Sequence, residues 1–238
     1  MKTAALIIIG NEILTAKFAD ENSPYLLRRL RELGVSVRRV AVVPDVVEAI
    51  ADEVRRCSAT FELVFTTGGV GPTHDDITME SIAVAFETGC EVREELVETM
   101  RKKLRAPLSD AVLRMARVPK GAELWWDGEL AFPLVVKGNV HILPGVPSIL
   151  RLKFEAVADR FRSETTLATA RVVTRERESA IAPRLETALE RWPSIEIGSY
   201  PRHDEGPRHV IIIVESLDGE EVEAAARWLG SVLDPLEP

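Results

Sequence analysis

Three apolar segments that each precede a helical pattern constrain the fold of this chain most strongly. The first, AALIIIG at residues 4–10, is a continuous isoleucine-rich run, which is typical of a parallel strand buried on both faces. Strand patterns return at residues 35–44 and 62–69, and helical patterns follow the three strands at residues 23–33, 45–54 and 77–89. This alternation predicts right-handed βαβ units and a mostly parallel sheet with helices on both faces.

Local signals predict where the first helices begin and end. Ser23 is the expected N-cap of the first helix, with Pro24 at its first helical position and Gly34 as its stop. Asp45 is the expected N-cap of the second.

The later segments predict the end of one domain and the start of another. Residues 93–117 have a helical pattern broken by Pro107, which predicts two helices, and residues 131–147 give two strands around the Lys137-Gly138-Asn139 turn. An amphipathic helix at residues 148–161 closes the domain near Arg162. Residues 168–233 then follow the order strand, helix, strand, strand, helix. We predict a three-layer α/β domain at residues 1–165, in which helices cover both faces of a mostly parallel sheet. A smaller α+β domain of βαββα order follows at residues 166–238.

Composition excludes several functional classes. The chain has 238 residues and a formal net charge of -8, without a basic stripe, which argues against nucleic-acid binding. The apolar run at residues 4–9 is too short to span a bilayer and lacks the flanks of a signal peptide. We therefore expect a cytoplasmic protein without a membrane partner. Cys57 and Cys90 stand alone, which favours reduced thiols over a zinc site.

Three loops follow predicted parallel strands and have unusual compositions. They are residues 10–22, residues 68–76 and the Pro144-Gly145-Val146-Pro147 turn, which is rigid and exposes backbone amides. Ligands bind at the carboxyl ends of strands in open parallel sheets, so the fold predicts that these loops meet at one edge.

The middle loop, within VFTTGGVGPTHDDITME at residues 64–80, has the composition of an anion site. Its glycines permit positive φ and close backbone approach, and a predicted helix N-terminus lies just downstream. Phosphate or pyrophosphate is the natural ligand, although the loop matches neither the Walker A motif nor GxGxxG. A structural turn remains the alternative.

Adjacent carboxylates add a reason to expect a metal. Asp75 and Asp76 would repel a bound phosphate unless a cation lay between them, and Mg²⁺ prefers carboxylate, water and phosphate oxygens. Asp20 joins them from the first loop in this interpretation, and Glu80 shares a helix face with Asp76 if the helix begins that early. The alternative is that Asp76 and Thr78 cap the helix while Asp75 is solvated.

Other polar and aromatic residues have two interpretations each. His74 is either a general acid or base or an exposed loop residue. Glu12 follows a buried strand, where a carboxylate needs a partner, so it is expected to face a ligand or to form an ion pair. Trp125 and Trp126 are expected to pack rather than to stack on a ligand.

The second predicted domain contains a basic and aromatic loop, GSYPRHDEGPRH. One interpretation is a loop that binds a phosphate or a nucleobase. The alternative is a solvated hairpin loop. The residues in question are Tyr200, Arg202, His203, Arg208 and His209.

Taken together, these stretches resemble a known family. GNEIL, DENSPYLLRRLRELG, VVPDVVEAI, TTGGVGPTHDDITMESIA, VHILPGVPSIL and IEIGSYP are similar, in order, to the molybdopterin-binding (MoaB/Mog) family. Within it, the chain looks most like the CinA N-terminal and FAD synthase molybdopterin-binding-like subgroup. TTGGVGPTHDDIT is the most specific of these motifs.

The resemblance implies a three-layer α/β domain that binds a pterin or a nucleotide phosphate at the Gly-rich loop. It makes Asp76 the key acidic residue, with Asp20 across the site. Mog-type relatives adenylylate molybdopterin or insert molybdate, whereas CinA-like relatives hydrolyse the pyrophosphate of ADP-ribose or FAD with a divalent metal. The second domain resembles the CinA middle region, which favours the hydrolase branch.

The chain departs from the family's pattern in two places. The segment WWDGELAFPLVV is shorter than the family's loop and retains only Pro133, which leaves the substrate open. The second departure is that the chain ends near Pro238 without the deamidase domain of CinA or the adenylyltransferase domain of FAD synthase, so we expect neither activity.

We therefore predict a metal-dependent pyrophosphatase for ADP-ribose, FAD or a similar nucleotide. Its alternatives are a molybdopterin-binding or adenylylating protein and a non-catalytic nucleotide-binding module. Mg²⁺, or another divalent cation such as Co²⁺, is the expected cofactor, and a homodimer or homotrimer is the expected assembly. The expected catalytic and metal-binding residues are Asp76, Asp20 and Asp75, and the expected substrate-binding residues are Glu12, Asn22, Thr67, Gly68, Gly69, Val70, Gly71, Thr73, Thr78, Pro144, Gly145 and Pro147.

Overall fold

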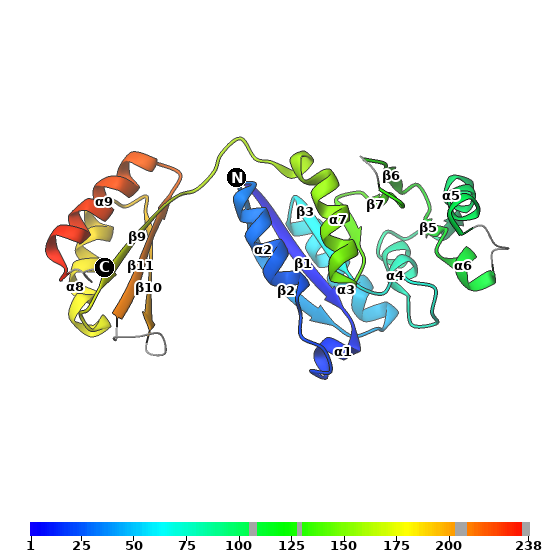
Figure 1. Cartoon of the computed structure of the whole chain (residues 1–238), viewed down its shortest axis with the longest axis horizontal. Coiled ribbons are helices and arrows are strands. Elements are labelled where there is room, and N and C mark those ends of the chain that lie inside the picture. Colours follow the sequence, from blue (N-terminus) through cyan, green and yellow to red (C-terminus); the bar gives the residue numbers. More distant parts are fainter. Residues whose placement is uncertain (105–108, 128–129, 203–208, 235–238) are drawn as a thin grey trace. The chain divides into compact units, whose positions relative to one another are not determined.

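The chain forms two compact units, each with its own hydrophobic core. The computed structural model describes residues 1–104, 109–127, 130–202 and 209–234 (Figure 1). The units are Met1–Glu164 and Thr165–Pro238, so the division lies one residue before the predicted domain boundary. Within the described residues, no helix combines the length and the apolar character that a bilayer crossing requires.

The first unit is built on a six-stranded sheet. Its strand order is β2-β1-β3-β8-β7-β6. The pairs β1/β2, β1/β3 and β3/β8 are parallel, while β7 pairs antiparallel with both β8 and β6. The predicted mostly parallel sheet is therefore confirmed, with an antiparallel hairpin at one side. The strands are β1 Lys2–Ile9, β2 Val35–Val43, β3 Leu63–Thr67, β6 Glu123–Trp125, β7 Leu134–Lys137 and β8 Val140–Leu143.

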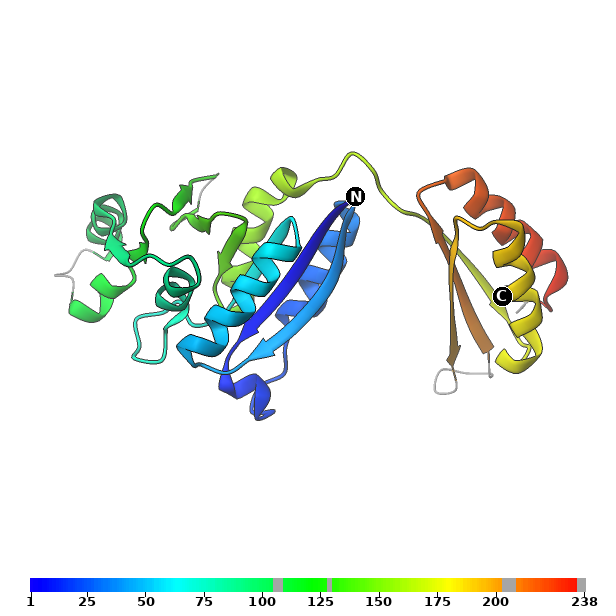
Figure 2. The ribbon, with the colours of Figure 1, turned by 180° about the vertical axis from the view of Figure 1, so that it is seen from behind.

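Helices bury both faces of this sheet (Figures 1 and 2). Along β1, Leu6 and Ile8 pack into one cluster with α2 (Asn22–Glu32) and α7 (Pro147–Val157). Ile7 and Ile9 pack into the opposite cluster with α3 (Val47–Thr60), α4 (Thr78–Ala85) and α5 (Glu94–Leu104). Each such side chain contributes about 1.5–3 kcal/mol on burial, so the isoleucine run specifies both layers.

Two predicted helix starts were wrong for a common reason. Ser23 is the second residue of α2, because the Asp20 carboxylate accepts the N–H groups of Asn22 and Ser23, each at 3.0 Å. Asp45 does not cap α3, which begins after Val46 without a side-chain cap. The Asp45 carboxylate instead accepts the Asn11 N–H at 2.8 Å. In both places an aspartate carboxylate bonds other amides than the expected ones, locally at Asp20 and across 34 residues at Asp45.

Short elements complete the first unit. Helices α5 and α6 (Asp110–Arg114) confirm the predicted pair, although Pro107 between them lies outside the described residues. The two-stranded sheet of β4 (Cys90–Val92) and β5 (Arg117–Pro119) was not predicted, because three residues are too few for a strand pattern. The remaining helices are α1 Asn11–Leu14 and the 3-10 helix η1 Ala158–Phe161.

The second unit has the predicted strand, helix, strand, strand, helix order. Its three strands form an antiparallel sheet of order β10-β11-β9, and α8 and α9 contribute to its core. The predicted basic loop is only partly described: Tyr200 and Arg202 lie in β10 and His209 opens β11, whereas residues 203–208 lie outside the described residues. The elements are β9 Ala168–Thr174, α8 Glu178–Arg191, β10 Glu196–Arg202, β11 His209–Ser216 and α9 Gly219–Val232.

An aromatic cluster in the first unit encloses a histidine. His141, on β8, is 3% exposed and stacks on Phe65 with ring centroids 5.0 Å apart. Trp125 and Phe161 pack edge-on against the imidazole. The predicted packing role of Trp125 is therefore confirmed, whereas Trp126 is 44% exposed. Burial lowers the pKa of His141 to about 4, so the ring is neutral at pH 7.

This burial predicts a specific loss of stability in mild acid. The folded-state pKa of His141 lies below the unfolded value of about 6.5, so the unfolded state binds more protons between these values. As the pH falls from about 6.5 to about 4, protonation of His141 in the unfolded state lowers the free energy of unfolding by roughly 3 kcal/mol at most. Urea unfolding at pH 7.5, 6.0 and 5.0 should show a smaller decline for His141→Phe than for the native chain. Equal declines would show that His141 does not protonate on unfolding.

Candidate functional site

The carboxyl ends of β1, β3 and β8 meet at Gly68, as the sequence predicts. Gly68 has φ +104°, and a Cβ there would lie 2.1 Å from the Ile9 carbonyl oxygen. Its N–H donates to the Leu143 carbonyl at 3.3 Å. A Cβ on Gly145 would lie 3.2 Å from the Gly68 Cα, so the last loop also touches this point. Only glycine fits such a close approach with positive φ.

Asn22 ties the first loop to the other two. Its Nδ2 donates to the Thr67 Oγ1 at 3.0 Å and to the Gly145 carbonyl at 2.8 Å. A carbonyl accepts only from a donor, so this pair fixes the orientation of the amide. The side chain is 7% exposed, and its Oδ1 has no hydrogen-bond partner among the described groups. Asn22 therefore links the first loop to the carboxyl end of β3 and to the loop after β8.

The Gly-rich loop folds back onto the start of α4. The buried Thr78 hydroxyl donates to the Gly68 carbonyl at 2.8 Å, and the Thr78 N–H donates to the Gly69 carbonyl at 3.0 Å. Gly69 has φ +61°, and a Cβ there would lie 2.5 Å from the Thr78 Oγ1. The alternative that Thr78 caps the helix is wrong, because α4 begins at Thr78 and the hydroxyl bonds the loop instead.

Three consecutive amides of this loop are unpaired. Within the part of the chain that the structure describes, the N–H groups of Gly69, Val70 and Gly71 donate to no acceptor. All three residues are half-buried. Backbone N–H groups rarely remain without a partner, and successive amides in such a turn form an anion-binding concavity. The loop therefore has the donors that a phosphate would need.

Two carboxylates share one hydroxyl beside these amides. The Thr73 hydroxyl lies at 2.6 Å from the Asp75 Oδ1 and also within hydrogen-bond reach of the Asp76 Oδ2, which accepts the Thr73 N–H at 2.8 Å. The hydrogen bond from Thr73 lowers the pKa of Asp75. A Cβ on Gly71 would lie 2.7 Å from the Asp76 Oδ2, so the glycine leaves room for this carboxylate. The alternative that Asp76 caps the helix is not what the structure shows.

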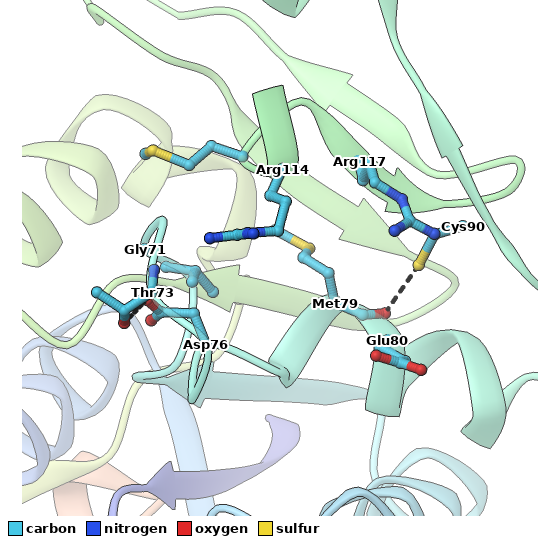
Figure 3. Close-up of a pocket in the computed structure, with 10 residues that line it drawn as sticks. Gly71, Thr73, Asp76, Met79, Glu80, Cys90, Arg114 and Arg117 are labelled. Carbon is cyan, nitrogen blue, oxygen red and sulfur yellow. Dashed lines mark hydrogen bonds between the residues drawn. The ribbon is translucent and has the colours of Figure 1, made fainter. Parts of the chain in front are cut away.

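A pocket of about 100 Å³ opens between this loop and the α6–β5 segment (Figure 3). Arg114 donates to the Pro72 carbonyl at 2.7 Å, and its guanidinium is turned toward the Gly-rich loop. Arg114 and Arg117 were not predicted as site residues, because their segment has no loop signal and its contact with the glycines is tertiary. The lining residues are Val70, Gly71, Thr73, Asp76, Met79, Glu80, Cys90, Arg114, Met115 and Arg117.

Several predicted site residues differ from expectation in their exposure or their contacts. Glu12 is exposed on α1 and folds over Gly10, so the premise of a buried carboxylate was wrong. The His74 side chain is 98% exposed, which agrees with the loop alternative. Glu80 and Asp76 share no helix face, since α4 begins at Thr78, but both line the pocket.

The metal ligands predicted from the sequence are only partly assembled. Asp20 bonds the first amides of α2, and the described residues contain no group of three His, Cys, Asp or Glu side chains that could hold a metal ion. Asp75 and Asp76 do lie together around Thr73. Oxygen ligands of this kind fit Mg²⁺, which is bound through one or two carboxylates and otherwise takes waters and substrate phosphates.

The close approach of the strand ends at Gly68 can be tested by substitution. We expect Gly68→Ala to lower the free energy of unfolding by more than about 2 kcal/mol, because the Cβ would collide with the Ile9 carbonyl. Gly89→Ala is the matched control, since nothing lies within 4 Å of a Cβ there. Chemical denaturation of both variants measures the difference. Equal stabilities would show that the strand ends can separate at no cost.

Comparison with known proteins places this site in a family. Residues 5–163 match the family model described as probable molybdopterin binding domain, and residues 166–236 match that described as FAD synthase, middle domain. A protein of Archaeoglobus fulgidus is 33% identical over 96% of this chain and 97% of its own length. A probable FAD synthase of Caenorhabditis briggsae is 31% identical over 98% of this chain, which spans 50% of that relative.

A solved structure is similar to the first domain of this chain. The protein CinA of Thermoplasma acidophilum, described as having unknown function, superposes with a TM-score of 0.62 at 31% identity. The superposition covers 67% of this chain and 98% of that one. The chain belongs to the molybdopterin-binding (MoaB/Mog-like) domain family, with a second domain of the FAD synthase middle type.

Proposed function

We propose that the protein is a metal-dependent pyrophosphatase that acts on ADP-ribose, FAD or a similar dinucleotide. The observation that carries the proposal is the row of unpaired amides at Gly69, Val70 and Gly71 beside the carboxylates of Asp75 and Asp76. Amides in this arrangement bind an anion, and the carboxylates would repel it. A divalent cation between the carboxylates and the anion would remove this repulsion, which favours a metal-bound diphosphate as the ligand.

The relatives support a nucleotide ligand. Both domains of this chain have counterparts in a protein called probable FAD synthase, whose name refers to a flavin dinucleotide. A diphosphate bridge is the chemical feature shared by FAD and ADP-ribose. The family description supports a pterin as the alternative ligand at the same loop.

Each residue of the site has a distinct role in this proposal. The amides of Gly69, Val70 and Gly71 bind the diphosphate oxygens and orient the bond to be cleaved. Asp76 and Asp75 hold the ion, and the Thr73 hydroxyl and N–H fix the Asp76 carboxylate. Mg²⁺ or Co²⁺, when bound, supplies charge neutralisation and a water of lowered pKa.

The proposal predicts a large effect of removing one charge. Asp76→Asn retains an acceptor for Thr73 but loses the negative charge that would hold the ion. We expect kcat for ADP-ribose to fall by at least about a hundredfold, with little change in melting temperature. Mass spectrometry of the products, with and without Mg²⁺ or Co²⁺, measures the release of AMP from ADP-ribose, FAD and NAD.

Asp159→Asn is the matched control. This carboxylate is 89% exposed and bonds Arg162 at the surface. It should retain full activity. Metal-independent cleavage, or unchanged turnover by Asp76→Asn, would contradict the proposal. Absence of any cleavage together with copurified pterin fluorescence would favour the molybdopterin-binding alternative.

A further inference from the structure

We infer that the pocket lined by Arg114 and Arg117 is the subsite for the second phosphate of the diphosphate, the one farther from the adenosine. This assignment rests on the proposed function and adds two binding residues to it. Both arginines come from the α6–β5 segment, whereas every residue discussed above as a ligand comes from the three strand-end loops.

Arg114 is fixed in place at the edge of the Gly-rich loop. One of its guanidinium nitrogens, Nη2, donates to the Pro72 carbonyl at 2.7 Å. Its Nη1 and Nε make no hydrogen bond or ion pair to any other described residue. Figure 3 shows its guanidinium turned toward Gly71 and Asp76. A guanidinium held by one bond with further donors exposed is suited to bind a phosphate.

Arg117 adds a second cation at the other end of the pocket. It lies on β5 opposite Val92 of β4, and its guanidinium lies beside Cys90 (Figure 3). Arg117 forms no ion pair with any described carboxylate, although Glu80 lines the same pocket. Burial raises the pKa of the Cys90 thiol, and the positive charge of Arg117 opposes that rise. Its charge therefore acts on the pocket without being neutralised by an ion pair.

The size of the pocket indicates which part of a dinucleotide it can hold. Its volume is about 100 Å³, enough for several waters, since each needs roughly 10–15 Å³. Pockets for whole drug-sized ligands are larger, about 300–1,000 Å³. The volume of this pocket is below that range, which favours a single phosphate over a flavin or an adenine ring with its sugar.

The charges on the lining agree with this assignment. Two arginines, Arg114 and Arg117, and two carboxylates, Asp76 and Glu80, line the pocket. Their formal charges cancel before any ion binds. Once a divalent cation lies on Asp76, the balance becomes positive on the side of the Gly-rich loop. The unpaired amides of Gly69–Gly71 then bind the first phosphate, and the arginines bind the second.

Comparison of ADP with AMP isolates the second phosphate. Isothermal titration calorimetry of the full chain with Mg²⁺ should show that the native protein binds ADP more tightly than AMP. Arg114→Ala should weaken ADP binding by at least about tenfold, since charge-assisted hydrogen bonds are lost, and AMP binding by less than about threefold. Arg114→Lys should give an intermediate loss.

Arg28→Ala is the matched control, because Arg28 is exposed on α2, which packs on the opposite face of the sheet. It should bind both nucleotides like the native chain. Arg117→Ala, at an exposed position on β5, gives the second measurement should Arg114→Ala fail to fold. A smaller but selective loss of ADP affinity is expected for it.

Equal affinity of the native chain for ADP and AMP would overturn the assignment. So would equal losses for the two nucleotides in both arginine variants. The outcome is separable from that of the pyrophosphatase test. If dinucleotides are not cleaved but the selective loss of ADP affinity is found, the subsite stands and the hydrolytic step falls.

Discussion

The absence of a side chain at Gly68 is the constraint on which the rest of the site depends. A Cβ at this position would lie 2.1 Å from the Ile9 carbonyl oxygen, so any other residue would drive β3 and β1 apart at their carboxyl ends. The close approach lets Gly68 bond Leu143 on β8 and lets Asn22 reach both Thr67 and Gly145. The loops are therefore held by backbone contacts, and the amides that follow Gly68 remain available to a ligand.

Much of this framework could be predicted from the sequence, because its signals are local. The isoleucine-rich run at residues 4–9 needs apolar partners on both faces, and the structure supplies them in two separate clusters. The meeting of three loops followed from the parallel topology alone. The start of α3 was wrong because the Asp45 carboxylate bonds Asn11, a tertiary contact across 34 residues. The start of α2 and the conformation of Glu12 depend on local contacts with Asp20 and Gly10, which the periodicity of the sequence does not specify.

The pocket beside the Gly-rich loop could not be predicted for the same reason. Arg114 and Arg117 lie on a five-residue helix and a three-residue strand, neither long enough to show a periodic pattern. Their place beside Gly71 depends on the β4/β5 pairing and on the bond from Arg114 to Pro72. The sequence marks residues 68–76 as one wall of a site, but nothing local indicates that a segment about 40 residues later forms the other wall.

The central claim is that the Gly-rich loop and its carboxylates bind a metal and a diphosphate together. A crystal structure of the chain with a non-hydrolysable ADP-ribose analogue and Mn²⁺, whose anomalous signal identifies the ion, tests it most directly. The account predicts an anomalous peak beside Asp76 and diphosphate oxygens within hydrogen-bond distance of the amides of Gly69, Val70 and Gly71. An analogue bound elsewhere, with these amides facing solvent and no ion at Asp76, would contradict it.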